Sequence, residues 1–222
     1  MCAASQPGFF ISFEGSEGCG KSTQIRLLVE ALKEDGREAL LIREPGGTPI
    51  GEHIRHLLQH SADGRAMVPE TELLLFAASR AQLVRQAILP ALDAGQVVIS
   101  DRFLDSTTVY QGVARQIPAD LVAQINRFAA GTRLPDITFL LDMDSAAALG
   151  RVRQRPAALN KPDRMEEEPL AFYEAVRHGY IAVAASEPKR FCVLDATQPA
   201  EAIAESIQSA LQSRGLFQRT SA

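Results

Sequence analysis

Short apolar runs alternate along the chain with longer stretches in which apolar residues recur every three or four positions. The apolar runs predict five buried strands, at about 9–13, 38–43, 96–100, 136–141 and 190–194. The periodic stretches predict helices, at about 22–33, 50–58, 69–93, 118–130, 169–185 and 199–211. Because strands that alternate with helices pair in parallel, the pattern predicts a three-layer α/β fold, with one five-stranded parallel sheet flanked by helices.

Nothing in the pattern divides the chain into separate units. The 222 residues contain no internal repeat and no low-complexity linker, so we expect a single domain over 1–222 with its core at about 9–213. The stretch at about 150–168 is polar, rich in arginine and interrupted by two prolines. This composition predicts a mobile insert, or lid, beside the core. We expect 218–222 to be frayed.

Composition narrows the class of protein. Hydrophobic residues make up 46% and charged residues 23% of the chain, which is typical of a globular protein and excludes disordered and fibrous classes. The formal net charge of −4 argues against a protein that coats nucleic acid. The three cysteines lack the spacing of a zinc site or a disulfide framework, which favours a reducing compartment. With no membrane-length apolar run and no secretory signal pattern, we expect no membrane partner and a cytoplasmic location.

The strongest signal is the sequence GSEGCGKS at 15–22, which follows a predicted strand and opens a predicted helix. It fits the P-loop pattern G-x-x-x-x-G-K-[ST] in its required context. The glycines let backbone N–H groups converge on an anion, and the following helix adds the positive end of its dipole. Lys21 can then reach the β- and γ-phosphates of a nucleoside triphosphate, and the Ser22 hydroxyl can ligate Mg²⁺. The fold is therefore expected to be of the P-loop NTPase type.

A P-loop leaves three functions open: phosphoryl transfer to a small molecule, a GTPase switch, and a mechanical ATPase. The sequence NKPD at 160–163 matches the guanine-reading pattern N-K-x-D, but it lies in the polar stretch and not at the end of an apolar strand. No aspartate is followed three positions later by glycine, so the usual γ-phosphate switch element is missing. Both observations disfavour the GTPase.

Polar residues also follow other predicted strands. Asp101 stands at the end of the strand at 96–100, where a carboxylate can hold the magnesium shell. Arg102 comes next and can bridge two phosphates that approach each other. A second anion-facing candidate combines the segment 43–47 with Arg55. The alternatives are a surface ion pair for the Asp-Arg pair and a solvated helix charge for Arg55.

The polar stretch has its own candidates. Arg151, Arg153 and Arg155 recur at a spacing of two, and Lys161 and Arg164 follow. A polyphosphate would neutralise this charge, so one interpretation is a lid that closes over ATP and excludes water. The alternative is an ordinary solvated basic segment.

Seven short motifs occur in this order: FEGSEGCGKST at 13–23, REPGGT at 43–48, LFAASR at 75–80, DRF at 101–103, DS at 105–106, YQG at 110–112 and DA at 195–196. In this order the chain resembles the bacterial thymidylate kinases, over about 9–211. The resemblance implies transfer of the γ-phosphate of ATP to dTMP, which gives dTDP and ADP. It also implies a Mg²⁺ requirement, a five-stranded parallel sheet and a homodimer.

The resemblance implies roles for single residues. ATP would be bound by Gly15, Ser16, Glu17, Gly18, Cys19, Gly20, Lys21, Ser22, Thr23, Arg151 and Arg155. The dTMP molecule would be bound by Glu17, Glu44, Arg55, Phe76, Arg80, Arg102, Thr107, Tyr110 and Gln111. Transfer would be assisted by Lys21, Arg102 and Arg153, and the metal would be held by Ser22 and Asp101.

On the sugar and phosphate side, the resemblance implies that Glu17 accepts a hydrogen bond from the 3′-hydroxyl. Arg55 and Arg102 would hold the phosphate of dTMP, with Glu44 nearby. Tyr110 would lie beside the sugar, where it crowds a 2′-hydroxyl.

On the base side, Phe76 would stack on thymine and Arg80 would donate to its O4. Thr107 and Gln111 would lie along the base edge. Without the resemblance, Phe76 would be taken as a core residue.

Two positions in the P-loop distinguish this chain. Some members of the family carry a basic residue where Gly18 stands, so here the assisting charge would come from the lid, first from Arg153 and then from Arg155 or Arg164. Cys19 is unusual at its position. Either its thiol is activated by neighbouring N–H donors, or it is a small residue tolerated at a variable position, which we favour.

Two other functions stay open at this point. The nearer one is a kinase for another nucleoside monophosphate, because the phosphate machinery would be shared. The more distant one is a nucleotide-binding switch module without productive turnover.

Overall fold

The computed structural model describes residues 8–61, 64, 66–154 and 164–217. Five parallel strands form one sheet in the order β2-β3-β1-β4-β5. The strands are β1 (Phe9–Glu14), β2 (Ala39–Arg43), β3 (Val97–Asp101), β4 (Ile137–Asp142) and β5 (Phe191–Asp195). Helices separate each strand from the next in the chain, as parallel pairing requires. The predicted α/β fold is therefore confirmed.

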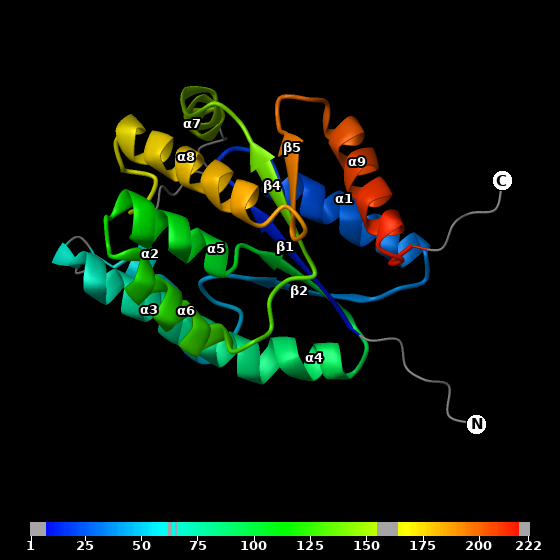
Figure 1. The fold of residues 1–222 in the computed structure, drawn as a ribbon, viewed down its shortest axis with the longest axis horizontal. Coiled ribbons are helices and arrows are strands. Elements are labelled where there is room, and N and C mark those ends of the chain that lie inside the picture. Colours follow the sequence, from blue (N-terminus) through cyan, green and yellow to red (C-terminus); the bar gives the residue numbers. More distant parts are fainter. Residues whose placement is uncertain (1–7, 62–63, 65, 155–163, 218–222) are drawn as a thin grey trace.

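Helices cover both faces of the sheet (Figure 1). On one face α1 (Lys21–Glu34) and α9 (Ala200–Ser213) pack together over alternate β1 residues such as Ile11 and Phe13. Phe10 points to the other face and packs against the helical stretch at 84–92. The remaining helices are α2 (Pro49–Gln59), α3 (Pro69–Leu83), the π-helical η2 (Val84–Ile88), α4 (Leu89–Asp93), α5 (Leu104–Thr107), the π-helical η3 (Thr108–Ala114), α6 (Ala119–Ala130), α7 (Ser145–Arg153) and α8 (Leu170–Ser186).

Two helical stretches were not expected from the pattern. The stretch of α5 and η3 follows β3, and Asn126 of α6 stabilises it by donating to Leu104 O at 3.2 Å and to Thr108 Oγ1 at 3.1 Å. This contact between distant segments has no counterpart in local periodicity. The second stretch is α7, capped by Asp144, whose side chain accepts from Ala147 N at 3.0 Å.

The boundary of the expected polar insert is corrected as a result. Residues 145–153 form helix α7, so Arg151 and Arg153 belong to a regular helix that follows β4. Arg155 and the NKPD sequence at 160–163 lie outside the described residues.

The carboxyl ends of the central strands are joined through their main chains. Arg102 N donates to Phe13 O at 3.0 Å, and Glu44 N donates to Asp101 O at 3.0 Å. The loops that follow β1, β2 and β3 are therefore fixed side by side at one edge of the sheet.

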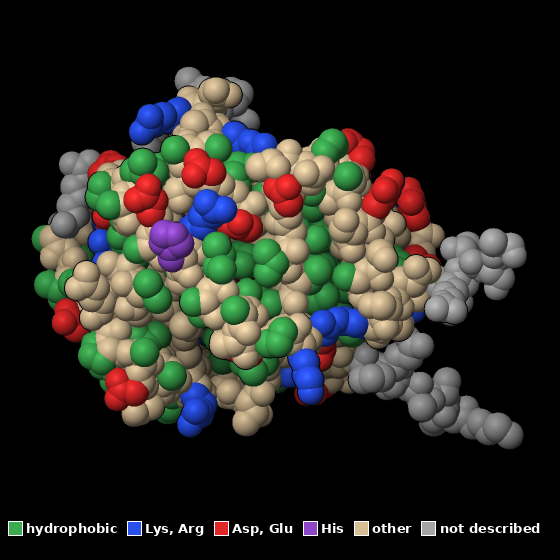
Figure 2. Space-filling view, turned by 45° about the horizontal axis from the view of Figure 1, so that its top comes forward, with side chains coloured by type: hydrophobic (Ala, Val, Ile, Leu, Met, Phe, Trp, Pro, Cys, Tyr) green, Lys and Arg blue, Asp and Glu red, His purple; other side chains and the backbone are tan. Residues whose placement is uncertain are grey.

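The surface carries both charges. On the face that Figure 2 shows, basic and acidic side chains are interspersed and do not gather by sign. No helix in the described part of the chain combines the length and the apolar character that a membrane crossing needs.

Candidate active site

A cavity of about 600 Å³ lies over the carboxyl ends of the strands. It is lined by residues from the P-loop, the loop after β2, helices α2 and α3, the end of β3, the α5–η3 stretch, α7 and the segment before α8. The following predicted site residues line it: Glu17, Gly18, Gly20, Lys21, Ser22, Thr23, Glu44, Arg55, Phe76, Asp101, Arg102, Thr107, Tyr110, Gln111 and Arg151.

The P-loop has the backbone geometry of an anion-binding nest. Gly15, Gly18 and Gly20 have φ values of 133°, 78° and 97°, which side chains disfavour. Gly20 is the N-cap of α1, so the amino end of the helix faces the cavity. Lys21 Nζ donates to Gly15 O at 3.0 Å and to Ser16 O at 2.8 Å, which holds the ammonium group across the loop.

Gly18 has no room for a side chain. A β-carbon there would lie 2.2 Å from Ala148 O and 3.0 Å from a methyl group of Val152, both on α7. A basic side chain at this position of the P-loop would therefore clash with α7 as it is placed here. The same helix brings Arg151 to the cavity, where its Nη1 donates to Ala196 O at 3.3 Å.

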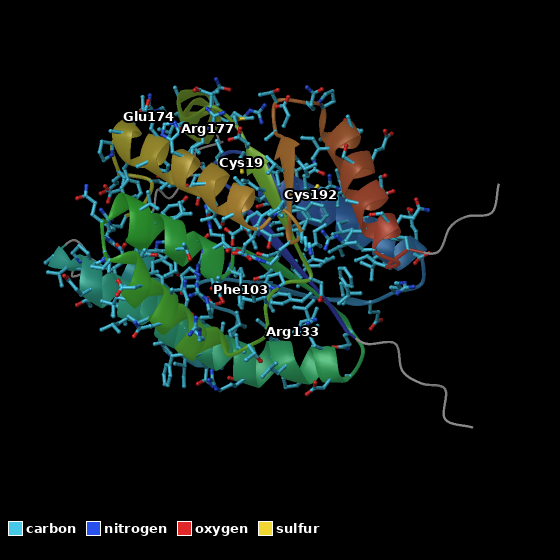
Figure 3. The ribbon with its side chains drawn as sticks, viewed as in Figure 1. Cys19, Phe103, Arg133, Glu174, Arg177 and Cys192 are labelled. Carbon is cyan, nitrogen blue, oxygen red and sulfur yellow. The ribbon has the colours of Figure 1, made fainter. Side chains whose placement is uncertain are left out.

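The two cysteines in the described part of the chain do not form a disulfide with each other. Figure 3 places Cys19 in the loop after β1 and Cys192 on β5, and both are free. Cys19 is 2% exposed and packs in the apolar core beneath the P-loop, so it acts as a small core residue.

Arg102 lies between the P-loop and the second half of the cavity. Its Nη2 donates to Glu17 Oε1 at 2.5 Å and to Tyr110 Oη at 3.3 Å, and its guanidinium lies 5.1 Å from the centre of the Tyr110 ring. Its Nη1 donates to Tyr180 Oη at 3.2 Å. The guanidinium is thus held by partners from the P-loop, η3 and α8, and it faces the cavity.

Glu14 is a residue that sequence reasoning missed. It ends β1 directly before the P-loop and is fully buried. Burial and the nearby charge of Asp105 raise its pKa to about 7. The signal available in the sequence was a glutamate at the end of the apolar run FFISFE.

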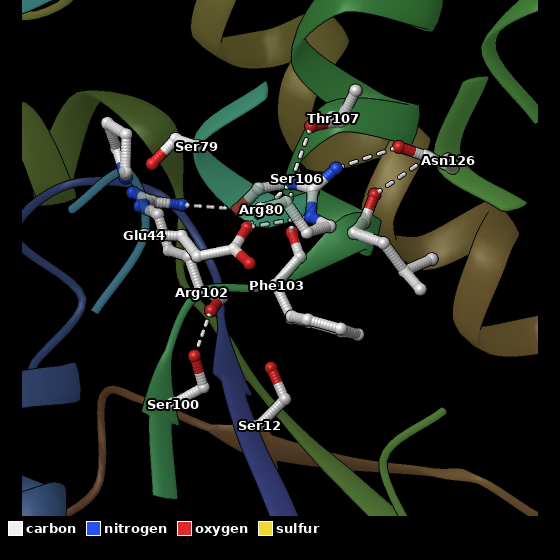
Figure 4. Close-up of polar contacts among 12 residues, drawn as sticks. Ser12, Glu44, Ser79, Arg80, Ser100, Arg102, Phe103, Ser106, Thr107 and Asn126 are labelled. Carbon is white, nitrogen blue, oxygen red and sulfur yellow. Dashed lines mark hydrogen bonds and ion pairs between the residues drawn. The ribbon is translucent and has the colours of Figure 1, made fainter. Parts of the chain in front are cut away.

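Arg80 is buried below the cavity wall and does not itself line the cavity among the described residues. Its Nε donates to Glu44 Oε2 at 2.8 Å, its Nη1 to Asn126 Oδ1 at 2.8 Å and its Nη2 to Thr107 Oγ1 at 2.8 Å (Figure 4). Its role toward thymine O4 stays a prediction. Asn126 was not identified from the sequence, because only the fold brings it to Arg80.

Glu44 is 5% exposed and borders the cavity. Burial raises the pKa of this carboxyl group, and the charge of Arg80 opposes the rise. Glu44 Oε1 has no hydrogen-bond partner among the residues that the structure describes. Glu44 therefore has one buried acceptor oxygen without a partner in the described part of the chain, in a residue that borders the cavity.

Glu72 fixes the segment that follows the expected lid. Arg164 forms a short hydrogen bond with Glu72, and Arg115 donates to the same carboxylate at 3.2 Å. Gln111 Nε2 also donates to Glu72, at 2.8 Å. Burial alone would raise the pKa of Glu72, but the hydrogen bonds from Gln111 and the arginines lower it. Arg164 is therefore engaged away from the P-loop.

Arg153 ends α7 with an exposed side chain and does not border the cavity in the described structure. Its part in transfer stays a prediction, as does that of Arg155. Arg55 does border the cavity, and its Nη1 donates to Pro45 O at 2.8 Å, which turns it toward the loop after β2.

The residues predicted to hold a metal fit a divalent cation. Ser22 is exposed at the start of α1, and Asp101 ends β3. Within the described ranges no hydrogen bond or ion pair engages the Asp101 carboxylate, so its oxygens remain available as ligands. Two protein oxygens with phosphate and water oxygens would complete the octahedral set that Mg²⁺ prefers.

A P-loop that adjoins a second arginine-lined half of one cavity is the arrangement of a P-loop phosphotransferase, which brings two phosphates together. The family model for thymidylate kinase matches residues 13–207. The thymidylate kinase of Geobacter sulfurreducens is 48% identical over 209 residues, which are 93% of this chain and 98% of that protein. That of Desulfosudis oleivorans is 49% identical over 206 residues, 91% of this chain and 96% of that protein. The chain belongs to the thymidylate kinase family.

A solved structure supports the same family. The crystal structure of thymidylate kinase from Ehrlichia chaffeensis matches with a TM-score of 0.73 and 33% sequence identity, over 93% of this chain and 99% of that one. The fold of this chain is therefore that of a P-loop NTPase, with its sheet and helices in the arrangement of this family.

Proposed function

We propose that the cavity holds ATP and dTMP end to end, with the P-loop around the phosphates of ATP and the α3–η3 half around dTMP. The enzyme phosphorylates dTMP with ATP and releases dTDP and ADP. The observation that carries the arrangement is the position of Arg102, bound to Glu17 of the P-loop on one side and to Tyr110 of η3 on the other. A guanidinium at this junction contacts both halves of the cavity.

In this proposal catalysis depends on positioning and on neutralisation of charge. The nucleophile is a phosphate oxygen of dTMP, already anionic near neutral pH, so no strong general base is needed. Lys21 neutralises the β- and γ-phosphates, and Arg102 and Arg55 bind the acceptor phosphate. Because these donors are fixed by the protein, they need little reorganisation as charge develops in the transition state.

Mg²⁺ would be held by Ser22 and Asp101 together with nucleotide phosphates. The exposed hydroxyl of Ser22 and the available carboxylate of Asp101 support this assignment. The ion supplies positive charge that orients and neutralises the phosphates when it is bound.

For dTMP, Phe76 would stack on the base, with Arg80, Thr107 and Gln111 along its edge. The Phe76 side chain in the cavity wall supports this proposal. The hydrogen bonds between Arg80 and Thr107, and from Gln111 to Glu72, support it too, because they fix these side chains. Tyr110 would exclude a 2′-hydroxyl, and Glu17 would accept from the 3′-hydroxyl.

The positive charge that assists phosphoryl transfer would come from arginines of α7 and of the segment that follows it. Arg151 borders the cavity, which supports a contact with ATP. Arg153 and Arg155 are the further candidates, and closure of the segment over ATP would bring them in.

The experiment that tests the acceptor is a coupled ADP-release assay with dTMP, dUMP, UMP, CMP, AMP and GMP at matched concentrations. We expect the highest kcat/KM with dTMP. A preference for another monophosphate would change the acceptor assignment, and no acceptor-dependent ADP release would remove the kinase function altogether.

We also propose a homodimer. Helix α3 packs against both α2 and α6. These helices expose apolar side chains, and residues seven apart share one face of a helix. The exposed residues are Ile50 and Leu57 of α2, Leu74 of α3, and Leu121 and Phe128 of α6. A second copy of the chain would cover this surface.

The proposed location is the cytoplasm, where ATP and dTMP are both available. Interspersed surface charge and the net charge of −4 give no support to a nucleic-acid partner.

A further inference from the structure

Arg102 is held in a backbone conformation that side chains disfavour. Its φ is 72°, in the left-handed region, which is strained for a non-glycine residue. Three hydrogen bonds fix it: Arg102 N donates to Phe13 O at 3.0 Å, Ser100 Oγ donates to Arg102 O at 2.5 Å (Figure 4), and Phe103 N donates to Glu14 Oε1 at 2.8 Å. The carboxyl group of Glu14 thus holds the peptide that directly follows Arg102.

The carboxyl group of Glu14 is also connected to the guanidinium group of Arg102. Glu14 Oε2 accepts hydrogen bonds from Ser106 Oγ at 2.7 Å and from Tyr180 Oη at 2.8 Å. Both hydroxyl oxygens in turn accept from Arg102 Nη1, each at 3.2 Å. Two hydroxyl groups therefore connect the buried carboxyl group to the guanidinium.

These contacts place one side chain behind both the backbone and the guanidinium of Arg102. Glu14 is fully buried and, in the described part of the chain, borders no part of the cavity. Its donors come from β1, from the loop after β3, from α5 and from α8, so it joins segments that are distant in the sequence. A buried carboxyl group without such donors would be strongly destabilising.

We propose that Glu14 is a positioning residue for phosphoryl transfer, which holds Arg102 from beneath the cavity in the geometry that receives the phosphate of dTMP. The inference rests on the role of Arg102 given under the proposed function. It differs from a purely structural role because the effect of Glu14 passes through one guanidinium and reaches one group of the substrate. Loss of Glu14 would release Arg102 to ordinary negative φ values and to other rotamers.

The first test separates the phosphate of dTMP from its base and sugar. Glu14→Gln keeps the size of the side chain but replaces one acceptor oxygen by an amide nitrogen, which cannot accept from the hydroxyl groups. We expect it to weaken dTMP binding by about 10- to 100-fold, the range for loss of a fixed charged donor. Binding of thymidine, which lacks the phosphate, and the KM for ATP should change by less than about twofold. Isothermal titration measures the affinities for dTMP and thymidine, and steady-state kinetics measure the KM for ATP.

Tyr180→Phe provides a second, milder variant. It keeps the ring and removes one of the two connecting hydroxyl groups. We expect the same selectivity for the phosphate with a smaller loss, about three- to tenfold, as for one neutral hydrogen bond. Should Glu14→Gln fail to fold, Glu14→Asp, which keeps the carboxyl group but draws it back from its donors, decides the question by the same comparison of dTMP with thymidine.

A double-mutant cycle tests whether Glu14 acts through Arg102. In an Arg102→Ala background, Glu14→Gln should weaken dTMP binding by less than about twofold further, because the group that it positions is gone. The matched control is Asp136→Asn, a carboxyl group before β4 that accepts hydrogen bonds from Phe10 N and Arg133 Nη2, each at 2.7 Å. It should lower the midpoint of thermal unfolding and leave the ratio of dTMP to thymidine affinity unchanged.

Two results would overturn the inference. One is an equal loss of thymidine and dTMP affinity in Glu14→Gln, and the other is an undiminished effect of Glu14→Gln in the Arg102→Ala background. The single variant Arg102→Ala reports on the proposed function separately. If Arg102→Ala binds dTMP normally, the proposed role of Arg102 is wrong and this inference is wrong with it. If Arg102→Ala loses dTMP affinity and Glu14→Gln does not, only the role of Glu14 is removed.

Discussion

Gly18 and Ala148 lie so close that a β-carbon on Gly18 would stand 2.2 Å from the Ala148 carbonyl oxygen. The pair joins the P-loop to α7, the helix that carries Arg151 into the cavity. A glycine is required here for two reasons, since φ at Gly18 is also 78°. The position of α7 beside the P-loop therefore depends on a residue that has no side chain.

We expect Gly18→Ala to displace α7 and to raise the KM for ATP by about tenfold or more, comparable to the loss of one charged contact. Steady-state kinetics with varied ATP and saturating dTMP measure it. The matched control is Gly150→Ala on α7, where a β-carbon meets nothing within 4 Å. That variant should keep normal kinetics and gain up to about 1 kcal/mol of stability. Normal ATP kinetics in Gly18→Ala would show that α7 does not depend on this contact.

Removal of either central cation should slow turnover. Lys21→Ala and Arg102→Ala should each lower kcat by about 10²- to 10⁴-fold, because a preorganised charged donor is lost where the transition state needs it. The coupled ADP-release assay measures turnover at saturating ATP and dTMP. A variant that keeps turnover within twofold of the parent would lose its place in the mechanism.

Arg80→Ala should chiefly raise the KM for dTMP. It should also lower the free energy of unfolding by about 3–5 kcal/mol, because Glu44 would be left buried without its partner. The double variant Arg80→Met with Glu44→Gln removes both charges, so it should recover part of the stability without recovering the dTMP affinity. A selective rise in the KM for ATP would contradict the assignment of Arg80 to the base side.

Glu14 should make stability depend on pH. Its pKa is raised from 4.5 to about 7 by burial and by Asp105, so the folded state binds the proton more tightly than the unfolded state. This stabilisation is fully present below pH 4.5 and is lost as the pH rises through 7. The free energy of unfolding, measured by urea titration, should therefore fall between pH 5 and pH 7.5. The fall in the parent should exceed the fall in Glu14→Gln by up to about 3 kcal/mol. Equal falls in the two proteins would exclude the titration of Glu14.

The proposed dimer surface has a centre that can be tested. Phe128 is 81% exposed on α6, seven residues from Leu121. We expect Phe128→Glu to give monomers in light scattering at concentrations where the parent is a dimer, because a buried unpaired charge destabilises an interface. A control is Glu205→Gln on α9, away from these helices. A parent that is itself monomeric would dismiss the proposed dimer.

The sequence predicts the sheet, its neighbouring helices and the P-loop well, because their signals are local. Strand runs, helical periodicity and the G-x-x-x-x-G-K-[ST] spacing each fit within about twenty residues. The stretch of α5 and η3 is not predicted, because it is held by contacts such as those of Asn126, which lies on α6. Helix α7 has a local signal in the cap residue Asp144, but its arginines share the composition of the polar stretch that follows it.

The site was predictable only in part for a similar reason. Motif positions predict roles for Lys21 and Arg102, and the structure brings both residues to the cavity. The partners that fix them come from elsewhere: Tyr180 lies 78 positions from Arg102, and Glu14 lies 166 positions from Tyr180. A single sequence gives the residues of such a network but not their pairing, which depends on how α8 packs against the sheet.

The main-chain hydrogen bonds from Arg102 to Phe13 and from Glu44 to Asp101 connect the loops after three neighbouring strands. Because these bonds use backbone atoms, substitution of the side chains does not remove them. In the proposed function, side chains around the base could therefore change and alter which acceptor enters, while the backbone that carries Arg102 keeps its place beside the P-loop.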